Sequence, residues 1–306
     1  MKQIAFLFPG QGSQYVGMGK EFYENFSTAR QIFEEADDTL HLSISEICFK
    51  GPEEALKLTE NTQPAVLTTS IAALKVLQME KGMAPQFTAG HSLGEYSALV
   101  ASGALTFSEA VKIVRLRGKF MQEAVPIGEG AMAAILGMEQ EQVEKICEEV
   151  SFGEILTPAN FNCPGQIVIA GHSKAVERAI EKVKQEGKKA VLLPVSAPFH
   201  SPLMKPAGER LEKALEEISV SDLKIPVVTN VEAEVNRSKD RVKELLVAQV
   251  SNPVRWEESM RKIIEKGIEQ VLEIGPGKVL SGLMKRIDHH VENKNLEDLQ
   301  SLKKLS

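Results

Sequence analysis

The sequence feature that most constrains the fold is a short apolar segment that leads into a serine flanked by glycines. Residues 87–89 (FTA) are typical of a strand, residues 90–94 spell GHSLG, and residues 95–102 are good helix formers. Glycines on both sides of Ser92 allow a tight turn that projects the serine side chain from the edge of a sheet. The segment therefore predicts an α/β fold with a nucleophilic serine between a strand and a helix. The alternative is a serine that only caps the helix.

Three further segments extend this prediction to a mostly parallel sheet. Residues 4–8 (IAFLF) form a continuous apolar run that ends at the glycine-rich loop 9–14, as a buried parallel strand does. Similar strand signals occur at residues 226–230 and 270–277. We therefore expect an α/β-hydrolase-like core, with the loop after the first strand at the carboxyl edge of the sheet.

The segment 128–195 has a different pattern, in which two helices alternate with four short strands. The strands are expected at residues 131–136, 158–162, 166–170 and 190–195, and the helices at residues 141–149 and 173–187. This βαββαβ order is that of a small ferredoxin-like subdomain. We expect it to be inserted into a large subdomain made of residues 1–127 and 196–306, with the active site in the cleft between them. The polar tail from about residue 288 receives no function.

Composition narrows the classes of function. The 306 residues include 36 Lys and Arg against 42 Asp and Glu, and the net charge of -6 argues against binding nucleic acid over a broad surface. No stretch approaches the roughly 20 apolar residues of a membrane-spanning helix. The three scattered cysteines have neither zinc-site spacing nor disulfide density, and fit a reducing cytoplasm. We therefore expect a cytoplasmic protein without a metal site or a membrane segment, and a monomer, because no coiled-coil signal is present.

A nucleophilic serine needs a base, and His200 is the best placed of the six histidines. It lies in a loop bracketed by Pro198 and Pro202, directly after an apolar strand, where a rigid backbone can hold the imidazole toward a cleft. The alternative is a loop histidine bonded to the backbone. No acidic residue between Ser92 and His200 stands at an obvious strand end, so an amide or a backbone carbonyl could orient the imidazole instead.

Two further groups complete the predicted chemistry. The N–H of Leu93, at the start of the helix after Ser92, is the natural first donor to an oxyanion. Arg117 stands among apolar residues on the next predicted helix, where an unpaired guanidinium is costly to bury. A guanidinium can hold the carboxylate of a substrate through two parallel hydrogen bonds. A salt bridge to one of the chain's own carboxylates is the alternative.

These segments together resemble the malonyl-CoA:acyl carrier protein transacylases of dissociated fatty-acid synthesis, from residue 4 to about residue 287. The resemblance is carried by eight blocks in the same order: 8–14 (FPGQGSQ), 62–65 (TQPA), 90–95 (GHSLGE), 115–118 (RLRG), 160–166 (NFNCPGQ), 199–201 (FHS), 249–256 (QVSNPVRW) and 273–277 (EIGPG). Eight ordered blocks are hard to obtain by accident, and we find no departure at a position that matters for the chemistry.

The resemblance implies roles for ten residues. Ser92 would attack a malonyl thioester, with His200 as general base and then general acid, and the Gln249 position would orient His200. Gln11 and the Leu93 N–H would form the oxyanion hole, and Arg117 would bind the malonyl carboxylate. The remaining four positions would bind substrate: Asn160, Asn162 and Gln166 along the pantetheine cleft, and Phe199 beside the acyl group.

The implied reaction is transfer of malonate from coenzyme A to the phosphopantetheine thiol of acyl carrier protein, through a malonyl-serine ester. Phe199 resembles the malonyl-selective form, since methylmalonyl-selective relatives tend to carry serine at that position. Malonyl-CoA is then a substrate, and no cofactor is bound permanently. The alternatives are a transacylase that acts in trans on a polyketide carrier, a serine thioesterase or esterase, and a non-catalytic carrier-docking module.

Overall fold

The structure is a computed structural model that describes residues 2–195 and 197–305, in which strands alternate with helices along much of the chain. The strands are β1 (Ile4–Phe8), β2 (Phe87–Gly90), β3 (Gly130–Leu136), β4 (Leu156–Cys163), β5 (Gln166–His172), β6 (Lys189–Leu192), β7 (Val227–Val228), β8 (Val235–Asn236), β9 (Gln270–Ile274) and β10 (Glu292–Leu296). The helices are α1 (Lys20–Asn25), α2 (Ser27–Leu40), α3 (Ile44–Lys50), α4 (Glu53–Lys57), α5 (Thr59–Lys81), α6 (Gly94–Ser102), α7 (Phe107–Glu123), α8 (Gln140–Ser151), α9 (Ser173–Gln185), α10 (Lys205–Glu216), α11 (Val242–Ser251), α12 (Trp256–Glu265), α13 (Val279–Ile287) and α14 (Leu299–Lys304), with short 3₁₀ helices at Pro202–Met204 and Lys239–Arg241.

The larger sheet has the strand order β10-β9-β1-β2-β7-β8. Neighbouring strands in this sheet are parallel, except that β8 pairs with β7 in the antiparallel direction. All five residues of β1 are buried in the middle of this sheet. The predicted α/β class with a mostly parallel sheet is therefore confirmed. Because β1, β2 and β9 are parallel, their carboxyl ends lie at the same edge of the sheet.

Helices cover both faces of the larger sheet. Alternate side chains of a strand point to opposite faces, so Phe6 and Phe8 join one hydrophobic cluster while Ala5 and Leu7 join another. The first cluster contains buried residues of α2, α5 and α7, and the second contains Trp256 and other residues of α12 and α13. Buried on both sides, β1 needs the continuous apolar run that the sequence has there.

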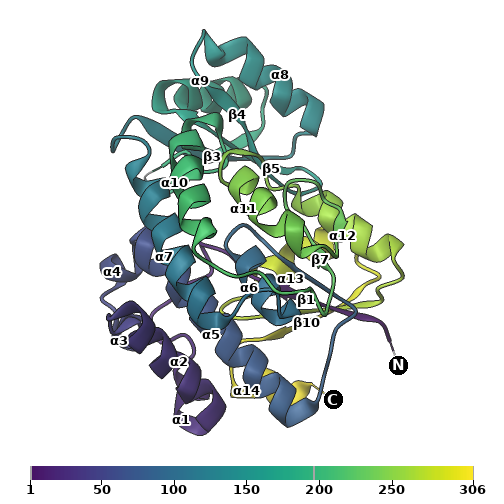
Figure 1. The fold of residues 1–306 in the computed structure, drawn as a ribbon. Coiled ribbons are helices and arrows are strands. Elements are labelled where there is room, and N and C mark those ends of the chain that lie inside the picture. The colour runs from purple at the N-terminus through teal and green to yellow at the C-terminus, as the bar shows by residue number, and fades with distance from the viewer. Residues whose placement is uncertain (1, 196, 306) are drawn as a thin grey trace.

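The smaller sheet has the strand order β4-β5-β3-β6, and each pair of neighbouring strands is antiparallel. Helices α8 and α9 pack on one face and lie at the top of Figure 1. The opposite face, with Met132 and Val168, belongs to the main core. A parallel bridge between Asn160 and Val254 also joins β4 to the segment before α12. The two sheets therefore share one core at their junction.

One expectation on an element boundary needs correction, and the polar tail contains two elements for which no expectation was stated. The last strand of the smaller sheet ends at Leu192 rather than at residue 195, and Ser196, at the expected subdomain boundary, lies outside the described residues. The polar tail contains β10, which pairs with β9, and α14, which Asp298 caps. Strand β10 is only partly buried at the edge of the sheet, so its polar residues carry no apolar strand signal.

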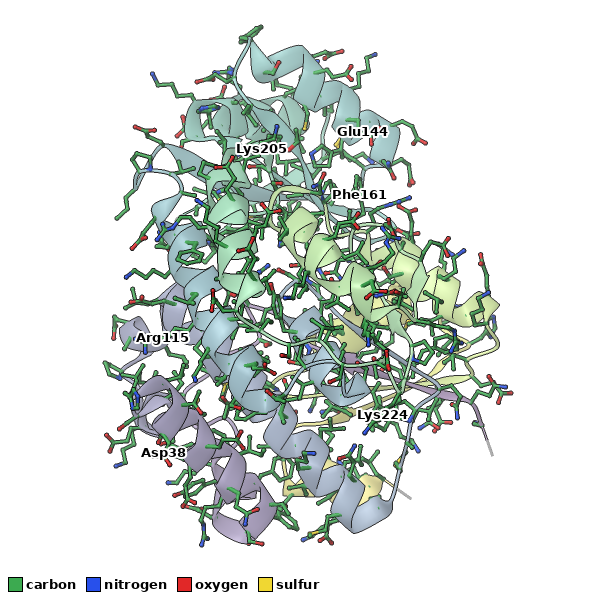
Figure 2. All side chains as sticks on the ribbon, in the orientation of Figure 1. Asp38, Arg115, Glu144, Phe161, Lys205 and Lys224 are labelled. Atoms are coloured by element: carbon green, nitrogen blue, oxygen red, sulfur yellow. The ribbon has the colours of Figure 1, made fainter. Side chains whose placement is uncertain are left out.

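Charged side chains lie mainly on the outside of this arrangement. Figure 2 shows Asp38, Lys205 and Lys224 projecting from the surface, where each is exposed. Among the described residues, the helices fall short of the length and apolar character needed to cross a membrane.

Candidate active site

Ser92 lies in the turn between β2 and α6, with a φ of 50° in the left-handed region. A Cβ added at Gly90 would lie 1.9 Å from the backbone of Gly94, and a Cβ added at Gly94 would lie 2.0 Å from the carbonyl oxygen of Phe8. Only glycine fits at these two positions, because the turn folds tightly on itself at Gly90 and packs against the end of β1 at Gly94. The strained turn places the Ser92 hydroxyl above the carboxyl edge of the sheet.

His200 reaches Ser92 from the loop between β6 and α10. Its Nε2 lies 2.7 Å from the Ser92 Oγ, and its Nδ1 lies 2.8 Å from the backbone carbonyl oxygen of Gln249. The imidazole is buried, and burial together with the positive charge of Arg117 lowers the pKa of His200 to about 3. It is therefore neutral at neutral pH, and if Nδ1–H donates to the carbonyl, Nε2 can accept the serine proton.

Gln249 takes part in the site through two different groups. Its backbone carbonyl faces His200, which is the non-acidic orienting partner that the sequence allowed. Its side-chain Oε1 accepts a hydrogen bond from Arg117 at 2.8 Å, and its Nε2 donates to the backbone oxygen of Ser92 at 3.0 Å. The side chain thus contacts the serine turn and the guanidinium, while the backbone contacts the histidine.

Arg117 is a buried cation whose partners are neutral. Only 1% of the residue is exposed, and its guanidinium donates to Gln63 Oε1 at 2.8 Å, to Gln249 Oε1 at 2.8 Å and to Ser92 Oγ at 3.1 Å. Among the described residues, no carboxylate oxygen lies within 4.0 Å of these nitrogens. Burial lowers the pKa of Arg117 from its usual 12.5. Arg117 therefore forms no salt bridge with a carboxylate of the described residues, which was the alternative to substrate binding.

A cavity of about 110 Å³ lies over the Ser92 hydroxyl. Its lining includes seven of the ten predicted site residues, two further polar residues and several apolar side chains: Gln11, Gln63, His91, Ser92, Leu93, Arg117, Met121, Met132, Asn160, Leu193, Val195, Phe199 and His200. Gln11 approaches from the loop after β1, where its Nε2 lies 3.4 Å from Thr59 Oγ1. The cavity thus joins a hydroxyl, an imidazole, a guanidinium and a side-chain amide in one apolar enclosure.

Of the three residues assigned to the pantetheine cleft, one lines this cavity, one lies beside it and one lies away from it. Asn160 lines it from β4, while Asn162 lies on the same strand with its Oδ1 2.9 Å from His91 Nε2. Gln166 is not among the lining residues, and its Oε1 accepts a hydrogen bond from Arg286 on α13 at 2.5 Å. The structure therefore brings Asn160 and Asn162 to the serine turn and leaves Gln166 at the β4–β5 hairpin.

Sequence reasoning missed two residues that hold the serine turn. Asn230 follows β7, and its side chain accepts from the Ser92 N–H at 2.7 Å and donates to the Gly90 carbonyl at 2.7 Å. Glu95 is buried on α6, and its Oε2 accepts from Gln249 Nε2 at 2.6 Å. Asn230 carries no local sequence signal of a site, and Glu95, although it ends the 90–95 block, was given no role. They can be recognised only once β7 and α11 are known to lie beside Ser92.

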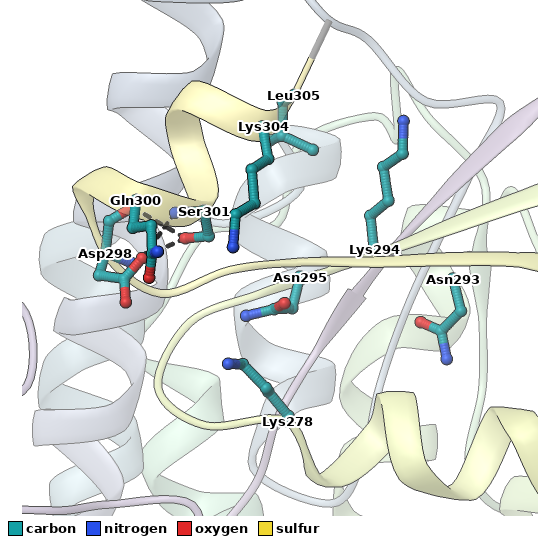
Figure 3. Close-up of a pocket in the computed structure, with 9 residues that line it drawn as sticks. All are labelled: Lys278, Asn293, Lys294, Asn295, Asp298, Gln300, Ser301, Lys304 and Leu305. Carbon is teal, nitrogen blue, oxygen red and sulfur yellow. Dashed lines mark hydrogen bonds between the residues drawn. The ribbon is translucent and has the colours of Figure 1, made fainter.

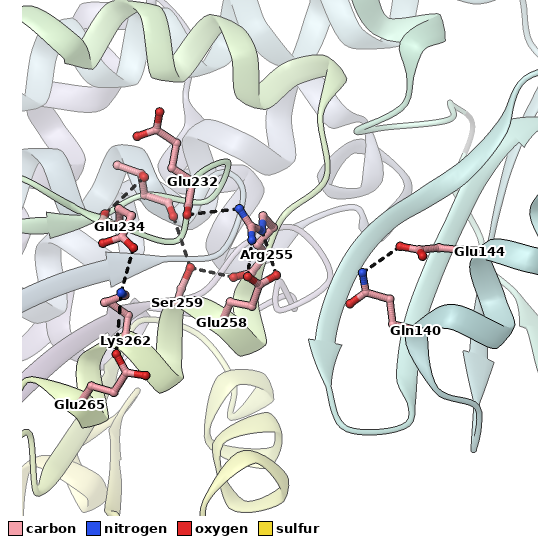
Figure 4. Close-up of polar contacts among 10 residues, drawn as sticks. Gln140, Glu144, Glu232, Glu234, Arg255, Glu258, Ser259, Lys262 and Glu265 are labelled. Carbon is pink, nitrogen blue, oxygen red and sulfur yellow. Dashed lines mark hydrogen bonds and ion pairs between the residues drawn. The ribbon is translucent and has the colours of Figure 1, made fainter.

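A network of polar contacts fixes the segment that carries Asn230. The Arg255 N–H donates to the Asn230 carbonyl at 2.9 Å. Figure 4 shows the Arg255 guanidinium, which donates to the Glu232 carbonyl at 3.3 Å and pairs with Glu258. Ser259 Oγ also lies 3.3 Å from the Thr229 carbonyl. The start of α12 therefore anchors the turn that supports Ser92.

A second cavity, of about 210 Å³, lies between β10, α14 and the loop before α13 (Figure 3). Three of its lining residues are lysines, and two of these already have acidic partners: Lys278 pairs with Glu297 at 2.8 Å and Lys294 with Glu292 at 3.1 Å. None of the ten predicted site residues lines it. The Ser92 cavity is therefore the candidate active site.

The fold and this site define an α/β protein whose candidate active site is centred on Ser92. Residues 5–302 match the family described as the acyl transferase domain. The chain is 53% identical over 304 residues to the malonyl CoA-acyl carrier protein transacylase of Bacillus subtilis, covering 99% of this chain and 96% of that protein. It therefore belongs to the acyl transferase domain family, among the malonyl CoA-acyl carrier protein transacylases.

Two solved structures have the same fold at high identity. The malonyl CoA-acyl carrier protein transacylase of Clostridium perfringens superposes with a TM-score of 0.96 at 48% identity, covering 99% of this chain and 95% of that one. A malonyl-transacylase solved in complex with its type II PKS acyl-carrier protein superposes with a TM-score of 0.96 at 47% identity, covering 98% of each chain.

Proposed function

We propose that this acyltransferase moves a malonyl group from coenzyme A to the phosphopantetheine thiol of an acyl carrier protein, through an ester on Ser92. Malonyl-CoA is then a substrate, and the carrier protein is both partner and acceptor. The names of the relatives support both assignments. The single observation that carries the proposal is Arg117, a buried cation with neutral partners, 3.1 Å from the Ser92 Oγ. A carboxylated acyl group would supply the missing counter-charge.

In the first half-reaction, Ser92 Oγ attacks the thioester carbonyl as its proton passes to His200 Nε2. The 2.7 Å contact between Oγ and Nε2 supports this assignment, and the Gln249 carbonyl would keep the imidazole in the correct tautomer. The tetrahedral oxyanion would be held by the Leu93 N–H, at the start of α6, and by Gln11. The C–S bond then breaks, and His200 returns the proton to the coenzyme A thiolate.

In the second half-reaction, the carrier thiol gives its proton to His200 and its sulfur attacks the malonyl ester. The C–O bond to Ser92 then breaks, and His200 protonates the serine oxygen. Arg117 would hold the malonyl carboxylate in both halves, so that the acyl group cannot rotate out of reach. Phe199, on the cavity wall, would leave little room for an α-methyl group.

We place the thioester arm along the smaller sheet. Asn160 lines the cavity and Asn162 contacts His91 beside it, which supports their assignment to the pantetheine cleft. Gln166 has weaker support, because its side chain is engaged by Arg286. We describe residues 128–195 as a ferredoxin-like subdomain inserted between 1–127 and 196–306 of an α/β-hydrolase-like core, with the site between them. The β4-β5-β3-β6 order supports the first description, and the Ser92 turn supports the second.

The same proposal has the enzyme act in the cytoplasm as a monomer, without nucleic acid, a metal or a permanently bound cofactor. The described cysteines, Cys48, Cys147 and Cys163, are free and buried, which fits a reducing compartment. The mechanism above uses only side chains and backbone groups of this chain. Light scattering after size-exclusion chromatography tests the monomer, since a mass near 67 kDa, about twice that of one chain, would contradict it.

Intact-mass measurement after brief mixing with malonyl-CoA tests the central proposal. We expect a malonyl adduct in the parent protein, no adduct in Ser92→Ala, and loss of the adduct when holo carrier protein is added. An esterase would release malonate to water without the carrier, and a docking module would form no adduct. Offering carriers of fatty-acid and type II polyketide synthesis in parallel identifies the acceptor, because one relative was solved with a polyketide carrier.

A further inference from the structure

Glu95 is a buried carboxylate beside the site that the proposed chemistry does not use. It lies on α6 three residues after Ser92 and is 2% exposed. Its Oε2 accepts hydrogen bonds from Gln249 Nε2 at 2.6 Å and from the Asn230 N–H at 3.3 Å. A carboxyl group costs free energy to bury, so these contacts need a reason.

The first consequence of Glu95 concerns the Gln249 amide. The Gln249 Nε2 faces three oxygens, on Glu95, on the Ser92 backbone at 3.0 Å and on the Asn230 side chain at 3.4 Å. A flipped amide would direct its oxygen at these three oxygens and its NH₂ at the Arg117 guanidinium, where donor would face donor. Of the three acceptors, Glu95 makes the shortest contact, so it contributes most to the choice of amide orientation.

The second consequence concerns Arg117. With the amide in this orientation, Gln249 Oε1 accepts from Arg117 Nη2, the same nitrogen that donates to Ser92 Oγ. The amide thus stands between the Glu95 carboxylate and the guanidinium. A direct salt bridge would use up the positive charge, whereas a neutral amide oxygen positions the guanidinium and leaves its charge for a ligand.

We propose that Glu95 is a positioning residue that fixes the Gln249 amide and thereby holds Arg117 ready for the substrate carboxylate. This inference rests on the proposed malonyl transfer, because it assigns Arg117 to an anionic acyl group. It predicts that loss of the Glu95 acceptor weakens the handling of a carboxylated acyl group more than that of an uncharged one.

The test compares Glu95→Met, which removes the acceptor, with Glu95→Gln, which keeps an oxygen at the same reach. For each variant, kcat and KM are measured with malonyl-CoA and with acetyl-CoA. For Glu95→Met we expect the ratio of kcat/KM for malonyl-CoA to kcat/KM for acetyl-CoA to fall about tenfold or more. The fall should come mainly from a higher KM for malonyl-CoA, because a hydrogen bond to a charged group is loosened. Glu95→Gln should restore most of the ratio.

Glu273→Gln is the matched control, since Glu273 is also a fully buried carboxyl, but its oxygens accept from backbone N–H groups at the start of α13. We expect it to leave the malonyl-to-acetyl ratio unchanged. If Glu95→Met does not fold, Glu95→Asp, whose shorter side chain draws the acceptor away from Gln249, is expected to lower the same ratio.

A double-mutant cycle with Gln249→Leu completes the test. Because Glu95 is inferred to act through Gln249, the change in the ratio on adding Glu95→Met should vanish in the Gln249→Leu background. Equal losses on both substrates, or additive effects in the cycle, would overturn the inference and leave Glu95 a structural residue. Failure of the proposed function is a separate result, seen as the absence of any malonyl adduct in the parent protein.

Discussion

Arg117 and His200 share one hydrogen-bonding partner, since the Arg117 Nη2 lies 3.1 Å and the His200 Nε2 lies 2.7 Å from the same Ser92 Oγ. A guanidinium and an imidazole therefore converge on the atom that we propose becomes acylated. In the proposed mechanism the guanidinium would stabilise a serine oxygen that is losing its proton. Burial and, after it, the charge of Arg117 lower the pKa of His200 and keep the imidazole neutral. The same cation is in reach of a carboxylate carried by the acyl group.

Arg117→Met should therefore change which acyl group is accepted. We expect kcat/KM for malonyl-CoA to fall by about a hundredfold or more, because the buried substrate carboxylate would lose the cation that the proposal assigns to it, and activity with acetyl-CoA to rise. Arg115→Met is the control, since Arg115 lies on the same helix but donates to the Leu40 carbonyl instead. An unchanged acyl preference in Arg117→Met would count against the carboxylate assignment.

The pH dependence of serine reactivity tests the state of His200. Burial and the Arg117 charge lower the pKa of His200 to about 3, so the imidazole remains an unprotonated base throughout the range from pH 5 to 8. Inactivation of Ser92 by a neutral sulfonyl fluoride should therefore be nearly independent of pH between 5 and 8. A histidine at its usual pKa of about 6.5 would instead slow the reaction by about thirtyfold at pH 5.

Arg117→Met also serves as the comparison in this experiment. Removing the cation removes one of the two main causes of the lowered pKa, so the acid limb of the profile should move to higher pH. A loss of reactivity near pH 6.5 in the parent enzyme and in Arg117→Met alike would contradict the lowered pKa of His200 and the part of Arg117 in lowering it.

The parts of the site that could be predicted are those with a local sequence signal. Ser92 stands between two glycines that the tight turn requires, His200 lies between prolines, and Arg117 lies in a largely apolar stretch of its helix. Each signal is contained in a few neighbouring residues. The structure brings these three side chains together, while their catalytic roles remain predictions.

The rest of the site depends on contacts between distant segments. Asn230 supports Ser92 only because β7 pairs with β2, and Glu95 acquires its partner only because α11 packs beside α6. The Gln249 position could be assigned near His200, but not the division of labour between its backbone and its side chain. The edge strand β10 was missed for a related reason, since a half-exposed edge needs no apolar pattern.

Phe199 should determine how well an α-methyl group is tolerated. It lines the cavity beside His200 and is 8% exposed. Phe199→Ser should raise kcat/KM for methylmalonyl-CoA relative to malonyl-CoA by roughly tenfold, since one methyl group in an apolar pocket is worth about 1–3 kcal/mol. Competition between the two thioesters, read by intact mass, measures the ratio. Phe199→Leu should give a smaller gain, and no gain in either variant would contradict the prediction.

Glu95 should also make the stability of the fold depend on pH. Burial is the main cause that raises the pKa of Glu95 from 4.5 to about 7. The unfolded chain loses this proton near pH 4.5, while the folded chain keeps it until about pH 7, so the folded state binds more protons between these values. The contribution of Glu95 to the free energy of unfolding is therefore complete below about pH 4.5 and falls as the pH rises to about 7.

His200 acts in the opposite sense, because its lowered pKa makes its contribution grow as the pH rises from about 3 to 6.5. The contribution of His200 is the same in the parent and in Glu95→Gln, so it cancels when the two free energies of unfolding are compared. Urea unfolding, followed by the fluorescence of the single tryptophan Trp256, gives the free energy of both proteins at pH 5, 6, 7 and 8. We expect the parent to lose stability relative to Glu95→Gln mainly between pH 5 and 7, with a smaller remaining loss between pH 7 and 8, because half of Glu95 is still protonated at a folded pKa of about 7. A difference that is constant with pH would mean that Glu95 is already ionised in the folded protein at pH 5.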